Sequence, residues 1–238
     1  MKSENLVKLV VFDWAGTTVD YGSFAPNDVF DLIFREAGIN LTRQEINGPM
    51  GMEKKAHIHA LLSLDTASAQ WNQIYGRDWS ESDVESLYVR FEEKLYEVVK
   101  EYSRPIVGVV ETVETLRKNK VKIGSTTGYN NRIMNQVIPE ADKYGYRPDC
   151  VVTPDMTGVG RPAPFMLYEC MRKLDVYPPR AVVKVGDTIT DIYEGKNAGA
   201  WSVGILTGSN LLGLREEEYD HMTEEELAER KKETRSYR

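Results

Sequence analysis

The chain of 238 residues has only two cysteines, Cys150 and Cys170, and no apolar run long enough to span a membrane. Two cysteines cannot form a disulfide framework, so we expect a reduced, cytoplasmic setting. A membrane-spanning helix needs about 18 or more consecutive apolar residues, so we expect no membrane partner. The N-terminus also lacks the basic start and cleavage site of a signal peptide.

Positive charge is in short supply too. The 30 Lys and Arg residues face 37 Asp and Glu residues, which gives a formal net charge of −7. Affinity for nucleic acid comes from clustered Lys and Arg, so this balance argues against a nucleic-acid partner. A small phosphorylated ligand needs only a local positive site and stays compatible with the composition.

A buried strand is the clearest feature that is present. The stretch LVKLVVFDWAGTT (residues 6–18) opens with an apolar run that only Lys8 interrupts, which predicts a parallel strand ending at Asp13. Ligands of open α/β sheets bind just past such strand ends, so Asp13 is a candidate functional carboxylate, although it also fits a residue that only caps a turn. Gly16 and the threonines after it predict a tight loop whose free backbone N–H groups suit an anion.

The rest of the chain divides into two patterns. Residues 23–102 show helical spacing of apolar residues and no convincing strand, with Thr42 and Ser80 placed to cap helices. Beyond Pro105, helices alternate with expected strands at 121–126, 150–153, 181–185 and 201–206, and a charged helix closes the chain. This alternation predicts an α/β fold with a doubly wound parallel sheet. The core would comprise residues 1–21 and 104–238, and an α-helical cap, residues 22–103, would be inserted after the first strand.

Polar side chains follow four of the expected strands. In chain order they are Asp13, Thr126, Thr127, Arg161, Asp187 and, one helical turn further on, Asp191. Each alone also fits a turn residue, a helix cap or a surface charge. Because parallel strands end at the same edge of a sheet, we expect these residues to form one pocket.

The side chains of the expected pocket are suited to binding a metal ion and a phosphoryl group. Asp13 and Asp187 would repel each other unless a cation lay between them, and Mg²⁺ is a hard cation that takes oxygen ligands. Arg161 and a threonine hydroxyl suit the oxygens of a phosphoryl group. An aspartate can then act as the nucleophile and form an aspartyl phosphate. The sequence leaves the choice between Thr126 and Thr127 open.

These motifs resemble a known superfamily. DWAGTT, a strand-terminal STT, a basic residue in a loop and GDTITD resemble, in order, the four motifs of the haloacid dehalogenase superfamily. Most phosphatases of that superfamily carry an acid two residues after the nucleophile, where this chain has Ala15. Hydrolysis of an ordinary phosphate ester is therefore disfavoured, although the Ala15 carbonyl can still serve the metal.

The cap adds a second signature. PMG at residues 49–51 with a lysine shortly after it, together with GSTTGY, GRP and KVGDT, resembles the phosphonoacetaldehyde hydrolase family over about residues 6–220. The resemblance implies a phosphonate substrate cleaved to acetaldehyde and phosphate, a Schiff base on Lys54 rather than Lys55, and attack by Asp13 on phosphorus. It also implies a homodimer joined through the cap.

The resemblance further implies roles for the remaining site residues. Mg²⁺ would be held by Asp13, the Ala15 carbonyl and Asp187, with Asp191 in its outer shell. The substrate would contact Gly16, Thr126 or Thr127, Arg161, Met50, His57 and Tyr129. Two alternatives stay open: a phosphatase or phosphomutase acting on a small phosphate ester, and a ligand-binding homologue with weak catalysis.

Overall fold

A five-stranded parallel sheet forms the centre of the computed structural model, which describes residues 7–235. Its strands are β1 (Leu9–Phe12), β2 (Lys122–Thr126), β3 (Cys150–Val152), β4 (Val182–Gly186) and β5 (Trp201–Gly204). They pair in the order β3-β2-β1-β4-β5. Along the chain, β2 and β3 are added on one side of β1, and β4 and β5 then follow on the other side. The order reverses between β1 and β4, which is where open α/β sheets bind their ligands.

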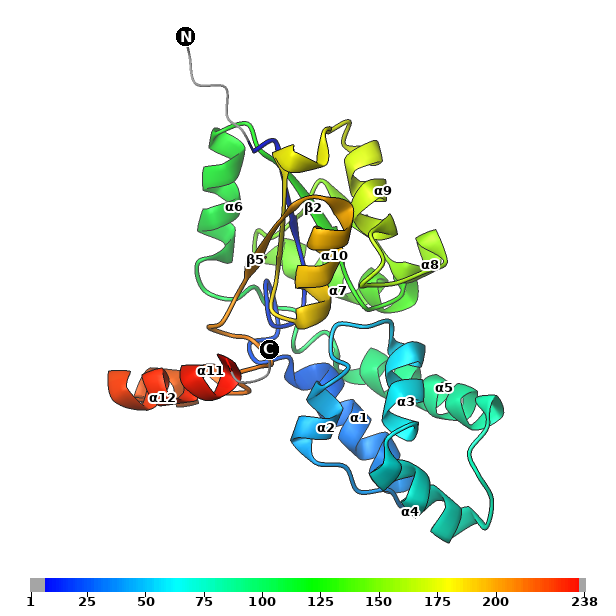
Figure 1. Cartoon of the computed structure of the whole chain (residues 1–238). Coiled ribbons are helices and arrows are strands. Elements are labelled where there is room, and N and C mark those ends of the chain that lie inside the picture. Colours follow the sequence, from blue (N-terminus) through cyan, green and yellow to red (C-terminus); the bar gives the residue numbers. More distant parts are fainter. Residues whose placement is uncertain (1–6, 236–238) are drawn as a thin grey trace.

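Helices cover both faces of the sheet (Figure 1). On one face lie α6 (Val109–Lys118) and α7 (Asn131–Lys143), and on the other α9 (Phe165–Lys173) and α10 (Ile189–Ala198). The side chains of β1 alternate between these two layers: Val10 and Phe12 join the first, whereas Leu9 and Val11 join the second. A strand covered on both sides must be apolar throughout, and this confirms the predicted doubly wound core.

Five helices lie between β1 and α6 in the chain, as expected of an inserted cap. They are α1 (Phe24–Glu36), α2 (Arg43–Asn47), α3 (Lys54–Leu62), α4 (Asp65–Tyr75) and α5 (Glu81–Val98). Capping boxes at Thr42 and Ser80 confirm two predicted helix starts. The helix α4 was not predicted separately, because only Ala67 and Trp71 of its residues are buried and its apolar stripe is weak.

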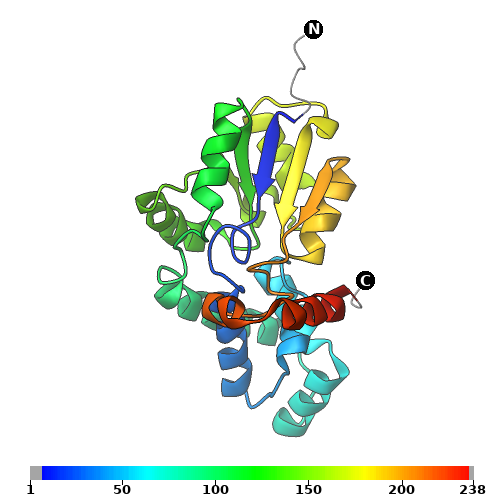
Figure 2. The same ribbon diagram turned by 90° about the vertical axis from the view of Figure 1, so that its left-hand side faces the viewer.

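The carboxyl ends of the strands point at this cap, as the arrowheads in Figure 2 show. The loop at the start of α3 lies directly on the core. A Cβ on Gly51 would fall 2.2 Å from Thr190 Oγ1, and one on Gly128 would fall 2.6 Å from the Met52 carbonyl oxygen. Thr190 Oγ1 also donates to the Met50 carbonyl at 3.2 Å. Glycine at these two positions therefore allows cap and core to close on each other.

The C-terminal part corrects two expectations. The charged segment forms two helices, α11 (Glu216–His221) and α12 (Glu224–Arg235), which lie beside the cap rather than on the sheet (Figures 1 and 2). The last strand ends at Gly204 rather than at the expected residue 206. The short α8 (Pro154–Thr157) and a 3₁₀ turn (Pro179–Ala181) complete the core. Among residues 7–235, no helix combines the length and the hydropathy needed to cross a membrane.

Candidate active site

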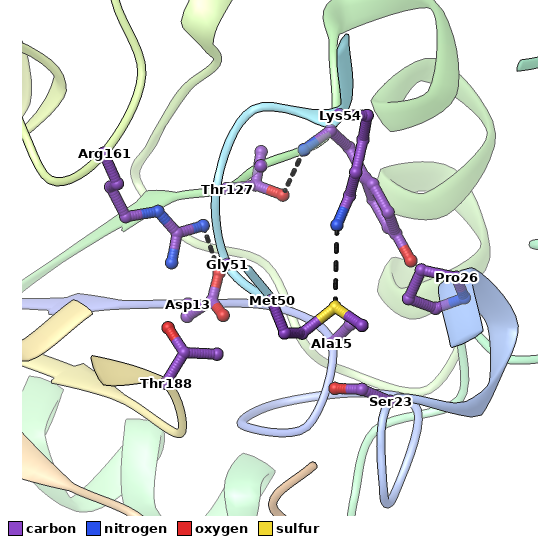
Figure 3. A pocket seen from close by; sticks show the side chains of 12 residues that line it. Asp13, Ala15, Ser23, Pro26, Met50, Gly51, Lys54, Thr127, Arg161 and Thr188 are labelled. Atoms are coloured by element: carbon purple, nitrogen blue, oxygen red, sulfur yellow. Dashed lines mark hydrogen bonds and ion pairs between the residues drawn. The ribbon is translucent and has the colours of Figure 1, made fainter. Parts of the chain in front are cut away.

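A small pocket lies between the sheet edge and the cap (Figure 3). Its wall contains many of the predicted residues: Asp13, Ala15, Met50, Lys54, Thr127, Tyr129 and Arg161, completed by Ser23, Pro26, Gly51, Gly128 and Thr188. Figure 3 shows Arg161 and Asp13 together at one end, while Lys54 reaches in from the cap toward Met50. The structure thus brings these residues, which come from distant strand ends and from the cap, together in one pocket.

An arginine holds the carboxylate end of the pocket. Arg161 Nη2 donates to Asp13 Oδ1 at 2.8 Å, and Arg161 Nη1 pairs with Asp191 Oδ1. All three side chains are buried. Arg161 lies in the loop region after β3, and its guanidinium reaches past the end of β2 to Asp13 at the end of β1. Its planar fork suits the two carboxylates now and the oxygens of a phosphoryl group when one is bound.

Three buried carboxylates gather at the same place. Oxygens of Asp13, Asp187 and Asp191 lie within 4.8 Å of one another. Thr17 Oγ1 donates to Asp187 Oδ1 at 3.2 Å, and the backbone N–H of Asn210 donates to Oδ2 at 2.9 Å. Even so, burial and the negative charges of Asp13 and Asp191 raise the pKa of Asp187 well above its ordinary value. An oxygen-lined cluster with surplus negative charge is the environment that a hard divalent cation stabilises, so these residues fit such an ion.

Asp191 stands behind the other two carboxylates. Its oxygens already receive Arg161 Nη1, Lys184 Nζ at 2.8 Å and the Thr188 hydroxyl. These contacts occupy the Asp191 oxygens that could otherwise coordinate a cation directly.

The two candidate threonines differ in their surroundings. Thr126 Oγ1 donates to Glu194 Oε2 at 3.0 Å and accepts from Lys184 Nζ at 2.9 Å, away from the pocket. Thr127 is in the pocket wall, where its Oγ1 accepts only from the backbone N–H of Tyr129 at 3.1 Å. The Thr127 hydroxyl hydrogen is therefore available to a ligand, and that of Thr126 is not.

Lys54 is a buried amine. It lies in the first turn of α3 and is only 6% exposed. Its Nζ is 3.8 Å from Met50 Sδ and lies 5.6 and 5.4 Å from the ring centroids of Phe30 and Tyr129. Burial, and next the positive charge of Arg161, lower the pKa of Lys54 to about 8. The neighbouring Lys55 points outward and pairs with Glu85 at 2.5 Å, so only Lys54 faces the pocket.

His57 lies behind the pocket wall rather than in it. Its Nε2 is 2.8 Å from the Ile46 carbonyl oxygen and so carries the proton. The buried Nδ1 has no hydrogen-bond partner among the described residues. Burial, and then the charge of Lys54, lower the pKa of His57 well below its ordinary value, so the ring is neutral with a free acceptor nitrogen.

One expectation about the first loop is wrong. The backbone N–H groups of residues 16–18 are not free for an anion, because Gly16 donates to the Val19 carbonyl and Thr17 and Thr18 donate to the Trp14 carbonyl. Gly16 serves the site by its lack of a side chain. A Cβ there would fall 2.3 Å from Asp187 Oδ2.

Sequence reasoning missed several residues that support the site. They are Thr188, Asn210 and two fully buried charged residues, Lys184 and Glu194, and the contact of the Thr17 hydroxyl with Asp187 was missed as well. Lys184 did leave a signal, since it interrupts the apolar strand VVKVG. A charged residue in a strand that is buried on both faces requires partners.

The family model for haloacid dehalogenase-like hydrolases matches residues 7–199. The chain belongs to this hydrolase family. It is 46% identical over 224 residues to a phosphonoacetaldehyde hydrolase of Bacillus cereus, covering 94% of this chain and 85% of that protein. It is also 51% identical over 221 residues, or 93% of its length, to a bifunctional phosphonoacetaldehyde hydrolase/aminoethylphosphonate transaminase of Clostridioides difficile, but spans only 35% of that protein.

The solved structure of a phosphonoacetaldehyde hydrolase-like protein from Oleispira antarctica superposes with a TM-score of 0.95 at 32% identity, covering 98% of this chain and 85% of that one. Together these relatives place the chain among the phosphonoacetaldehyde hydrolases within the larger family.

The lowered pKa of Lys54 predicts its reactivity. Since only the neutral amine is nucleophilic, acetylation of Lys54 by acetic anhydride should increase with pH with a midpoint near 8. Lys55 is the matched control, because its pairing with Glu85 raises its pKa. Peptide mass spectrometry between about pH 6 and about pH 11 would follow both residues. Parallel titration of the two lysines would contradict the buried position of Lys54.

Proposed function

We propose that this protein hydrolyses the carbon–phosphorus bond of phosphonoacetaldehyde to give acetaldehyde and phosphate. One observation carries the proposal: an amine of lowered pKa, Lys54, and a carboxylate held by an arginine, Asp13, line the same small pocket. The names of the relatives agree with it. A substrate with a carbonyl at one end and a phosphoryl group at the other is what such a pair can activate.

The first step uses the amine. Neutral Lys54 adds to the aldehyde carbon to give a carbinolamine, which takes up one proton from solvent and loses water to leave an iminium ion. The carbon next to phosphorus is then adjacent to an electron sink. His57 stays neutral and adds no positive charge beside the iminium ion, because burial and the charge of Lys54 lower its pKa well below its ordinary value. Met50 and Tyr129 enclose the aldehyde end.

The second step uses the carboxylate. Asp13 attacks phosphorus, the C–P electron pair moves into the iminium as an enamine, and an aspartyl phosphate forms. Arg161 and the Thr127 hydroxyl hold phosphoryl oxygens. Water then hydrolyses the aspartyl phosphate, while protonation and hydrolysis of the enamine release acetaldehyde and free Lys54. The leaving group needs no acid beside the nucleophile, which explains why Ala15 suffices there.

Mg²⁺ is the cation that we assign to the carboxylate cluster. Asp13, the Ala15 carbonyl and Asp187 would hold it, and Asp191 would lie outside. When bound, it neutralises the charge that otherwise opposes the approach of an anionic substrate to Asp13. The raised pKa of Asp187 supports this assignment.

We also propose how the parts act together. Residues 22–103 would be a cap that closes over a core of residues 1–21 and 104–238. The protein would function in the cytoplasm, a reducing compartment in which its two free cysteines would stay reduced. The chain would pair as a homodimer through the cap. Exposed apolar side chains on cap helices support this surface: Leu32, Ile74, Tyr75, Val89 and Tyr96.

Substitutions should separate the two halves of the reaction. We expect Lys54→Met to lose both phosphate release and the adduct trapped by borohydride with acetaldehyde, because no amine remains. Asp13→Asn should lose phosphate release by about 1,000-fold or more yet keep the acetaldehyde adduct. Lys55→Met, the matched control, should keep both. Phosphate assay and peptide mapping measure these outcomes, and an adduct on Lys54→Met that maps to the same pocket would contradict the proposal.

Removal of Mg²⁺ should act on stability as well as activity. Chelation should abolish phosphate release, and added Mg²⁺ should restore it. Mg²⁺ at about 100 times its dissociation constant should stabilise the fold by about 2.7 kcal/mol, seen as a rise in the thermal midpoint. The rise should vanish in Asp187→Asn and persist in Asp175→Asn, an exposed control. Equal rises in both variants would place the ion elsewhere.

The homodimer has its own test. Sedimentation velocity at micromolar concentration should give twice the mass of one chain, because the exposed apolar side chains on the cap would be covered in a dimer. Val89→Asp, on the exposed side of α5, should shift the protein toward the monomer while its helix content is kept. A wild-type monomer under these conditions would reject the dimer.

A further inference from the structure

Behind the pocket, two charged side chains are buried that the reaction above does not use. Lys184 lies in the middle of β4 and Glu194 in α10, and neither has any exposed surface. Neither belongs to the pocket wall. Burying a charge is costly unless it is paired and hydrogen-bonded, so their contacts should reveal what they do.

Their contacts lead to Arg161, which lines the phosphoryl end of the pocket. Lys184 Nζ lies 2.8 Å from Asp191 Oδ1, 3.3 Å from Glu194 Oε2 and 2.9 Å from Thr126 Oγ1. Glu194 Oε2 in turn lies 4.0 Å from Arg161 Nε. Lys184 and Arg161 therefore share the same two acidic partners, Asp191 and Glu194.

This sharing balances the charges around Arg161. Two cations, Arg161 and Lys184, face two anions, Asp191 and Glu194, so this group is neutral and leaves the charges of Asp13 and Asp187 for metal and substrate. Without Lys184, both acidic residues would act on Arg161 alone. The guanidinium would be drawn back toward α10 and away from Asp13, because attraction is strong in a poorly solvated interior.

We infer that Lys184 is a positioning residue: by pairing with Asp191 and Glu194 it keeps Arg161 directed at Asp13 and at the phosphoryl group. This inference rests on the proposed function. It makes a directional prediction. Loss of Lys184 should weaken phosphoryl binding, whereas loss of the Glu194 charge should leave it unchanged or make it tighter, because Arg161 then has one fewer competing anion.

The test measures the two ends of the pocket separately. Calorimetric titration with inorganic phosphate in the presence of Mg²⁺ reports the phosphoryl end and needs no turnover. Borohydride trapping with acetaldehyde reports Lys54. We expect Lys184→Met to weaken phosphate binding by about 10- to 100-fold and to leave trapping unchanged. Glu194→Gln should not weaken phosphate binding, and the double variant should recover most of the loss. Lys118→Met, an exposed lysine on α6, is the matched control.

Each result is decisive. Unchanged phosphate binding in Lys184→Met, equal weakening in Glu194→Gln, or no recovery in the double variant would overturn the inference. If Lys184→Met does not fold, Glu194→Gln decides alone: binding that is kept or tightened supports the inference, and a loss of about tenfold or more overturns it. Failure of the wild-type protein to release phosphate from phosphonoacetaldehyde would instead reject the proposed function, since phosphate binding is measured independently.

Discussion

The ion pair between Arg161 and Asp13 is the contact on which the rest of the site depends. It joins the loop after β3 to the tip of the central strand, with 2.8 Å between the two side chains and almost no solvent around them. Desolvating such a pair is costly, so it persists only because neighbouring charges compensate one another. The same guanidinium helps lower the pKa of Lys54. One residue from the core thus binds the carboxylate beside it and lowers the pKa of the amine that faces it from the cap.

The position of Lys54 depends in turn on how closely the cap approaches. Glycines at positions 51 and 128 let the loop before α3 lie against the loops that follow β2 and β4. This contact covers the pocket and excludes water from the amine, and burial is the largest cause of its lowered pKa. The contact that covers the pocket is thus also the one that makes the amine easier to deprotonate.

Much of this site could be predicted from the sequence. Parallel strands end at one edge, so Asp13, Arg161 and Asp187 had to converge once the strands were recognised. The choice between Thr126 and Thr127 could not be made, because it depends on where each side chain points at the end of β2. The amide groups after Gly16 were misjudged, since a tight turn uses its own N–H groups. The partners of Lys184 come from α10 and β2, and no local sequence pattern in β4 predicts them.

A crystal structure of the protein treated with acetaldehyde and borohydride in the presence of Mg²⁺ and phosphate tests the central claim most directly. The account predicts an ethyl group on Lys54 Nζ, directed at a phosphate that lies between Asp13, Arg161 and Thr127 under a closed cap. An unmodified Lys54 whose amine faces solvent, or a phosphate bound away from Asp13, would contradict it.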